Sequence, residues 1–231
     1  MNINPPKISC ICITNNRSSL LQKAIKCFDE QDYANKELVI SYPKDDKNTK
    51  AIIQQLLSEG RFDILAIERP ETELLGNARN DAIHKCRGTY VCIWDDDDWH
   101  HPTRLSYQIN SLQTTGKKYE ASILYRIFLY DYTTKLAYLS FPYHWDGTLL
   151  CRKEMLMHNQ YADKNKGEDS QIVPFMEKKG MLAHIDESPY LYIYTYHGNN
   201  TWPYDHFMYF IGKSILLNDE YNSHVNNLIN N

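Results

Sequence analysis

The sequence lacks cysteine pairs, long apolar runs and an excess of positive charge. None of its six cysteines stands in a C-x-x-C pair, so we expect reduced, buried thiols of a cytosolic protein. No apolar run approaches the ~20 residues that a membrane-spanning helix needs, and no apolar segment follows a basic start as in a signal peptide. The net charge of −4 also disfavours a general nucleic-acid binder, which would carry a basic stripe.

Glycine-rich nucleotide motifs are missing as well. The chain has neither the P-loop pattern nor G-x-G-x-x-G, which disfavours P-loop nucleotidases and dinucleotide oxidoreductases. It has no internal repeat and no flexible linker. Its 231 residues, 42% of them hydrophobic, suffice for one core. We therefore expect one domain over residues 1–231, with a ligand half (1–98), a more variable half (99–217) and a tail (218–231).

The chain does contain a run of four aspartates, residues 95–98, directly after the apolar segment 90–94. Such a segment is typical of a strand buried on both faces, and ligands of open α/β sheets bind at the carboxyl ends of strands. Adjacent carboxylates repel each other by about 4 kcal/mol per close pair, at about 4 Å and an effective dielectric of about 20. Mg²⁺ or Mn²⁺ would relieve that repulsion. The alternative is a solvated acidic turn that caps the next helix.

The first half alternates between strand-like and helix-like segments. Four strands are predicted, at residues 7–14, 37–41, 62–68 and 90–94. Ser18 or Ser19 is expected to cap the helix after the first strand. The alternation predicts a parallel sheet with right-handed crossovers, in which the ends of the first and fourth strands meet. Thr14, Asn15 and Arg17 would then lie beside the carboxylates, a combination that suits a phosphorylated ligand.

The second half is predicted to be more mixed. Helices are expected after Pro102 and over residues 170–179. Strands are expected over residues 121–132, 136–141, 148–152, 181–186 and 190–196, the first two as an antiparallel hairpin. From Asn218 onward, the Asn-rich end is expected to be a frayed helix or a tail. His100 and His101 are expected to be solvated.

Together these segments resemble the family 2 glycosyltransferases, over residues 7–210. ISCICITNNR resembles the family's first strand and its T-x-N-R turn, and NKELVI resembles the second strand. The most specific match is GNARNDAI followed by GTYVCIWDDDDWHHPTRL, which resembles the A-R-N segment, the D-x-D strand end and the next helix. GEDSQI resembles a later acidic motif, and HGNNTW a His-rich loop found in one subset. The resemblance implies the GT-A fold, an α/β fold whose mostly parallel sheet is flanked by helices, with a smaller antiparallel part.

The resemblance also implies roles for individual residues. The D-x-D segment would be Asp95, Asp96 and Asp97, with Asp97 as the direct ligand of Mn²⁺ or Mg²⁺. The donor nucleotide would be held by Thr14, Asn15, Arg17 and Arg79. Asp169 would be the general base, and His197 a third ligand of the metal or the diphosphate. Trp145, Asp146, Glu168 and Trp202 are candidate acceptor contacts, because a sugar packs its apolar face on aromatic rings while carboxylates take its hydroxyls.

One position departs from the family, and several residues have structural alternatives. The family usually has paired aspartates after the second strand, but this chain has Ser41 and Tyr42. Either Tyr42 stacks on the nucleobase or Asp45 reaches back to it. The alternatives are a surface ion pair for Arg79, a helix cap for Glu168 and Asp169, a strand-end histidine for His197, and core packing for the two tryptophans.

The activity implied is metal-dependent, inverting transfer of a sugar from a nucleotide-diphospho-sugar, with a UDP-sugar favoured. The acceptor would be a hydroxyl of a glycan or lipid-linked glycan, in bacterial polysaccharide or lipopolysaccharide synthesis. We expect the protein in the cytoplasm, either free or associated peripherally with the inner face of the membrane. We expect no nucleic-acid partner. Two alternatives stay open. One is a nucleotidyltransferase, although its usual glycine-rich signature is absent, and the other is a non-catalytic sugar-nucleotide-binding protein on the same fold.

Overall fold

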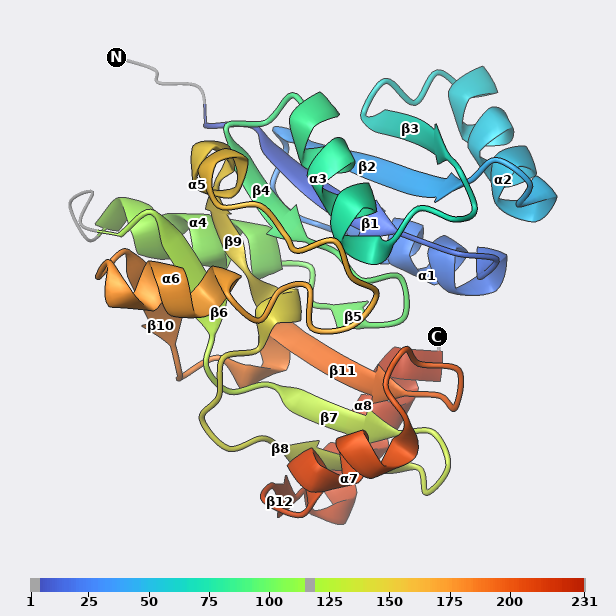
Figure 1. The fold of residues 1–231 in the computed structure, drawn as a ribbon. Coiled ribbons are helices and arrows are strands. Elements are labelled where there is room, and N and C mark those ends of the chain that lie inside the picture. The colour runs from blue at the N-terminus through green and yellow to red at the C-terminus, as the bar shows by residue number, and fades with distance from the viewer. Residues whose placement is uncertain (1–4, 115–118, 231) are drawn as a thin grey trace.

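The computed structural model describes residues 5–114 and 119–230. This part of the chain forms a seven-stranded sheet and a five-stranded sheet, both flanked by helices (Figure 1). In the view of Figure 1 the smaller sheet, with β7, β8 and β11, lies below the larger one.

The larger sheet has the strand order β10-β6-β9-β4-β1-β2-β3. Its strands are β1 (Ile8–Ile13), β2 (Lys36–Pro43), β3 (Ile64–Arg69), β4 (Tyr90–Ile93), β6 (Ala121–Leu124), β9 (Leu150–Arg152) and β10 (Leu182–Ile185). The four strands β1 to β4 are parallel, with Cys10 opposite both Leu38 and Cys92. Almost every residue of β1, β2 and β4 is buried, as expected for strands covered on both faces. The predicted parallel sheet is confirmed.

Helices cover both faces of this sheet. They are α1 (Ser18–Asp29), α2 (Lys47–Ser58), α3 (Leu75–Lys85), α4 (Arg104–Thr114), α5 (Lys153–His158) and α6 (Ile172–Lys178). Apolar residues of α1, α2 and α4 join one core cluster, and those of α3, α5 and α6 join the cluster on the opposite face. The predicted serine cap of α1 is wrong. Ser18 is already helical, and Arg17 stands at the N-cap without a side-chain hydrogen bond to the helix.

The centre of the larger sheet contains one reversed strand. β9 runs antiparallel to both of its neighbours, β4 and β6, whereas β10 returns parallel to β6. The sequence predicts a strand there but not its direction. β9 places the segment just before it, with the 3-10 helix η1 (Asp146–Thr148), beside the end of β4.

The smaller sheet has the order β12-β8-β7-β11-β5. Its strands are β5 (Trp99–His100), β7 (Phe128–Asp131), β8 (Leu136–Leu139), β11 (Tyr192–Tyr196) and β12 (Ile215–Leu216), with the 3-10 helix η2 (Pro189–Leu191) before β11. The predicted hairpin is correct for β7 and β8. The predicted extent of its first strand is wrong. Residues 121–132 form two strands, β6 of the larger sheet and β7 of the smaller one.

Two helices cover the smaller sheet, α7 (Tyr204–Ile211) and α8 (Asp219–Asn230). The sequence predicts a frayed helix or tail from Asn218, but α8 is a regular helix whose Val225 and Ile229 are buried. They pack in one cluster with Tyr130, Ala137 and Ile193. The spacing of four residues between Val225 and Ile229 is the helical period that buries one face.

Candidate active site

A cleft of about 1170 Å³ opens at the carboxyl ends of β1, β3 and β4. Its other side is formed by three segments that follow later in the chain, residues 142–148, 165–170 and 200–210. Typical small-molecule sites occupy about 300–1,000 Å³, so this cleft has room for a ligand larger than a single small molecule.

The four aspartates of residues 95–98, which we call the acidic run, have different surroundings. Asp96 is buried, accepts a hydrogen bond from Thr14 Oγ1 at 2.6 Å and pairs with Arg17 at 3.3 Å. Asp97 pairs with the same Arg17 nitrogen at 3.0 Å. Asp98 is instead structural. It accepts hydrogen bonds from the Tyr192 hydroxyl and, at 2.8 Å, from the backbone N–H of Thr195.

Asp95 belongs to a second charge cluster, centred on Arg79 of α3. One guanidinium nitrogen lies 2.6 Å from Glu168 Oε1 and 3.8 Å from Asp169 Oδ2. The other lies 3.2 Å from Asp95 Oδ1. Arg79 is only 8% exposed, so the alternative of a surface ion pair is wrong. The cluster joins the acidic run to the segment that carries Glu168 and Asp169.

A glycine makes this approach feasible. A Cβ atom on Gly76, at the start of α3, would lie 1.8 Å from the carbonyl oxygen of Ala162 and 3.3 Å from Glu168 Cβ. No side chain fits at that distance, so only glycine lets residues 161–168 pack directly on the helix that carries Arg79.

Negative charge exceeds positive charge at the acidic run. Burial, and next the charge of Asp97, raise the pKa of Asp96 to about 7. Burial raises the pKa of Asp95 as well, although Arg79 opposes that shift. The donor set consists of carboxylate oxygens, which Mg²⁺ and Mn²⁺ prefer, and a bound divalent cation would offset the repulsion. The residues present therefore fit a divalent metal.

His197 lies beside this carboxylate cluster. Its Nε2 is 3.2 Å from Asp97 Oδ2, and its backbone N–H donates to Asn200 Oδ1 at 2.8 Å. Arg17 donates to the carbonyl oxygen of Asn199 at 3.0 Å. The loop after β11 is thus fixed against Arg17 and Asp97, and His197 is near enough to share a ligand with Asp97.

The opposite side of the cleft carries aromatic rings and further acids. Trp145 is 7% exposed and packs 4.9 Å from the Phe210 ring, and its buried Nε1 has no hydrogen-bond partner among the described residues. Trp202 is 38% exposed and stacks on His206. Burial, and next the charge of Asp169, raise the pKa of Asp146 to about 8, and its buried Oδ1 likewise has no partner in the described part of the chain. The cleft thus offers aromatic surface to a ligand, whereas these two unpaired atoms are not accessible from it.

Glu168 and Asp169 precede α6 without capping it. The helix begins at Ile172, and Gln171 at the N-cap makes no side-chain hydrogen bond to it. Glu168 is buried and paired with Arg79, whereas the Asp169 side chain is 30% exposed. The alternative that these two side chains cap the helix is therefore wrong. Asp169 is the more accessible of the two acids.

Comparison with known proteins identifies the family. The model of the family described as Glycosyl transferase family 2 matches residues 9–177. The chain belongs to glycosyltransferase family 2. A GalNAc(5)-diNAcBac-PP-undecaprenol beta-1,3-glucosyltransferase of Campylobacter jejuni is 33% identical over 168 residues, which are 72% of this chain and 46% of that relative. The amylovoran biosynthesis glycosyltransferase AmsB of Erwinia amylovora is 37% identical over 102 residues, 42% of this chain and 33% of the relative. The chain thus spans less than half the length of these curated relatives.

Solved structures support the same fold. TarS 1–349 of S. aureus aligns with a TM-score of 0.64 at 14% identity, covering 82% of this chain and 60% of that one. The mannosyltransferase PcManGT of Pyrobaculum calidifontis, in complex with GDP-Man and Mn²⁺, also has a TM-score of 0.64, at 16% identity, over 83% of this chain and 56% of that one. The GT-A fold predicted from the sequence is confirmed. In the described part of this family 2 chain, no helix combines the length and apolar character needed to cross a bilayer.

The position at which this chain departs from family 2 lies outside the cleft. Tyr42 is buried in the core, its hydroxyl donates to Glu68 at 3.1 Å, and it does not line the cleft. Asp46 caps α2 by accepting from the N–H of Thr49, and Asp45 is exposed. The structure therefore does not place the Tyr42 ring where it could stack on a ligand in the cleft.

Arg69, at the end of β3, is a cleft residue that sequence reasoning missed. It is buried and donates to the carbonyl oxygen of Thr14 at 2.9 Å, and within the described part of the chain its Nε has no partner. Burial lowers its pKa from the ordinary arginine value. A charged residue that ends a strand of a parallel sheet was the available signal, because strand ends line ligand sites.

His100 was also misjudged. It is fully buried, stacks on Trp94 with 3.8 Å between ring centroids, and lies 3.3 Å from the carbonyl oxygen of Asp95. Burial, and next the charge of Arg104, hold the pKa of His100 well below its usual value. A neutral His100 supports the backbone at the start of the acidic run from within the core.

Proposed function

We propose that this chain catalyses metal-dependent, inverting transfer of a sugar from a nucleotide-diphospho-sugar to an acceptor hydroxyl. The observation that carries the proposal is the Arg79 cluster. It joins the carboxylates of the acidic run, where a donor diphosphate and its metal would bind, to Glu168 and Asp169 on the other side of the same cleft. We further propose one domain, with a donor half at residues 1–98, an acceptor half at residues 99–217 and the last segment at residues 218–231.

The donor side of the proposed site contains cations and metal ligands. Asp95, Asp96 and Asp97 would hold Mn²⁺ or Mg²⁺, with Asp97 as the direct ligand and His197 beside it. When bound, the metal would neutralise charge on the leaving diphosphate. Arg17 and Arg79 are placed to stabilise the same developing charge electrostatically. Thr14 and Asn15 line this side of the cleft and would contact the nucleotide, together with Arg69.

On the acceptor side, Asp169 would act as general base. Its carboxylate would accept the proton of the acceptor hydroxyl as that oxygen attacks the anomeric carbon, which inverts the configuration in a single displacement. Glu168 is held by Arg79, so its contribution would be to orient the arginine. Trp145 and Trp202 would contact the apolar face of the acceptor sugar, and Asp146 its hydroxyls.

The proposed substrates follow from the named relatives. Solved TarS structures contain UDP and UDP-GlcNAc, and the PcManGT structure contains GDP-Man; of these nucleotide-sugar classes we propose a UDP-sugar donor here. The Campylobacter relative is named for a polyprenyl-diphosphate-linked glycan, and the Erwinia relative for amylovoran. We therefore propose a glycan or lipid-linked glycan acceptor in bacterial surface polysaccharide or lipopolysaccharide synthesis, on the cytoplasmic side of the membrane and in peripheral association with it.

A donor-binding experiment tests this proposal. Calorimetry with UDP and a panel of UDP-sugars, with and without Mn²⁺, is expected to show metal-dependent binding in the wild type and its loss in Asp97→Asn. The matched control is Asp81→Asn, which removes an exposed aspartate on α3 that pairs only with Lys85 among described residues. Metal-dependent affinity that is unchanged in Asp97→Asn would refute the site.

Product analysis then separates the possible activities. Release or transfer of the sugar supports the glycosyltransferase. Formation of pyrophosphate from a nucleoside triphosphate and a sugar phosphate would indicate a nucleotidyltransferase instead. Binding without either product, across the donor panel and with glycan acceptors, would leave a non-catalytic sugar-nucleotide-binding protein.

A further inference from the structure

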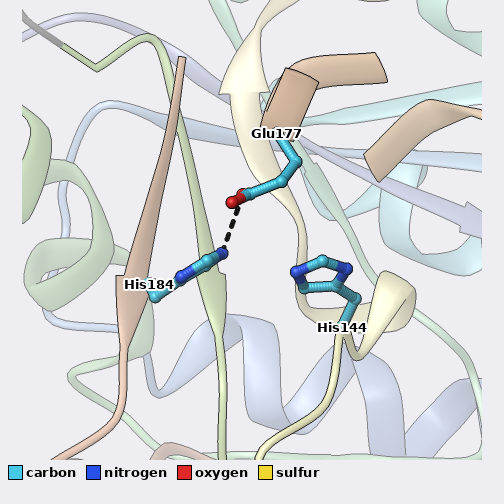
Figure 2. A group of neighbouring side chains, drawn as sticks. All are labelled: His144, Glu177 and His184. Carbon is cyan, nitrogen blue, oxygen red and sulfur yellow. Dashed lines mark ion pairs between the residues drawn. The ribbon is translucent and has the colours of Figure 1, made fainter. Parts of the chain in front are cut away.

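A second group of metal-ligating side chains lies beside the acceptor side of the cleft. His144 comes from the segment before η1, Glu177 from the last turn of α6 and His184 from β10. Figure 2 shows the three side chains turned toward one another from these separate elements. One ligand atom of each lies within 4.8 Å of the other two, and His184 Nε2 is 3.0 Å from Glu177 Oε2.

Packing holds this group in place from more than one side. The Tyr125 ring stacks on His184 with 4.5 Å between centroids and an interplanar angle of 10°. The same ring lies 5.8 Å from His144, and the two histidine rings are 5.3 Å apart. His184 is further fixed because β10 pairs with β6 along its length. The two imidazoles are therefore oriented by the sheet and an aromatic neighbour.

The ligand chemistry differs from that of the acidic run. Two imidazoles and one carboxylate are a donor set that Zn²⁺ accepts, with three protein ligands and one position left open. Zn–ligand bonds of about 2.0–2.2 Å in a tetrahedron put ligand atoms about 3.4 Å apart. The 3.0 Å separation of His184 Nε2 and Glu177 Oε2 would open by about 0.4 Å, and the two distances to the His144 nitrogen would close by at most about 1.4 Å from the 4.8 Å limit. The side chains of His184 and Glu177 are 31% and 45% exposed, which leaves space for a fourth ligand of the metal.

We propose that His144, Glu177 and His184 bind Zn²⁺, and that the ion fixes the distance between two segments of the acceptor side of the cleft, residues 142–148 and the helix α6 that follows residues 165–170. His144 lines the cleft and stands two residues before Asp146. Glu177 lies on the helix that follows Glu168 and Asp169. A bound ion would join the segment 142–146 to α6 and β10, which are consecutive elements later in the chain. This site is separate from the acidic run and does not depend on the proposed transfer reaction.

Zinc affinity measured on untagged, metal-stripped protein tests the site. The protein is titrated with Zn²⁺ against a chromophoric zinc chelator, in the wild type and in an Asp97→Asn background that weakens cation binding at the acidic run. We expect one tightly bound Zn²⁺ per chain that survives Asp97→Asn. His184→Ala should weaken it by at least about 100-fold, since loss of even an outer partner of a zinc ligand costs about 10–100-fold. His224→Ala, which removes an exposed histidine of α8, is the matched control and should change nothing.

Two further measurements keep the outcome decisive. Glu177→Gln changes one exposed carboxylate. Its zinc affinity tests the site if His184→Ala does not fold. Zn²⁺ should slow amide hydrogen exchange in residues 140–147 of the wild type but not of the ligand variants. Equal affinity in His184→Ala, Glu177→Gln and His224→Ala would overturn the site. Zinc binding that is lost in Asp97→Asn and kept in His184→Ala would place the ion at the acidic run instead. Loss of UDP binding in Asp97→Asn bears only on the proposed function.

Discussion

Asp169→Asn separates a general base from a residue that only stabilises the loop. Asparagine keeps the shape of the side chain but cannot accept a proton at neutral pH. If Asp169 is the base, turnover should fall by about 10²–10⁴-fold, which corresponds to about 2.7–5.5 kcal/mol in activation free energy. Donor affinity should stay near the wild-type value, because Asp169 pairs with none of the residues assigned to the metal and meets the donor-side Arg79 through a long contact of 3.8 Å.

The cost of this substitution in folding free energy is expected to be small. The side chain is 30% exposed, and its described ion pair is a 3.8 Å contact with Arg79. That distance is beyond hydrogen-bond range, and Arg79 keeps its closer partners Glu168 and Asp95. Loss of the Asp169 charge also removes repulsion with Asp146. No helix cap is lost, since Gln171 occupies the N-cap of α6. The free energy of unfolding should therefore change by less than about 1 kcal/mol.

The assay is single-turnover transfer at saturating donor, with urea unfolding in parallel. The control is Asp163→Asn, which removes an exposed acid of the same loop that accepts from Asn77. Near-normal turnover in Asp169→Asn would refute the base assignment, and Asp146 and Glu168 would then be the candidates to test. NMR of the product gives the anomeric configuration. A product with the configuration of the donor would refute the single displacement itself.

Three further predictions concern charge and nucleotide contact. Arg79→Met should lower the free energy of unfolding by about 3–5 kcal/mol, because it leaves buried carboxylates unpaired, and adding Glu168→Gln should restore part of the loss in urea titrations; fully additive effects would contradict the coupling. In EDTA-containing buffer, the carboxyl pKa of Asp146, raised by burial from the ordinary 3.8 to about 8, means that the folded state retains a proton that the unfolded chain has released. Stability should then fall as pH rises between these values, by up to about 1.4 kcal/mol per pH unit, and Asp146→Asn should flatten that slope. Tyr42→Leu, which removes the aromatic ring, should leave UDP affinity unchanged in calorimetry, whereas Arg69→Met should weaken it at least about tenfold; the reverse pattern would restore Tyr42 as the nucleobase contact.

The sequence was most informative where burial alone determines structure. The apolar segments 7–14 and 90–94 predict strands covered on both faces, and a parallel arrangement brings Thr14 and Arg17 to the acidic run. The separate role of Asp98 could not be predicted. Its partners, Tyr192 and Thr195, follow nearly a hundred residues later, and nothing local distinguishes it from the other three aspartates.

Several of the errors have the same physical cause. Residues far away in the sequence determine whether a polar or ambiguous segment is buried and which sheet it joins. His100 is buried because β5 pairs with β11, which places Tyr192 opposite it. Residues 121–132 have strand composition throughout, and periodicity does not indicate which sheet each part joins. The place of Arg69 at a strand end was a usable signal, but its contact with the backbone of Thr14 involves a residue 55 positions earlier, which local sequence does not reveal.

The reversed strand β9 has a consequence for the order in which the chain is synthesised. The parallel strands β1 to β4 need only the first 93 residues, but one edge of β4 stays unpaired until Leu150–Arg152 has been made. The β6–β10 pair can join the nascent sheet only through that same strand. An open edge of apolar residues is a template for association with other chains. A chain cut between β4 and β9 should therefore aggregate, even though it contains every strand of the parallel half.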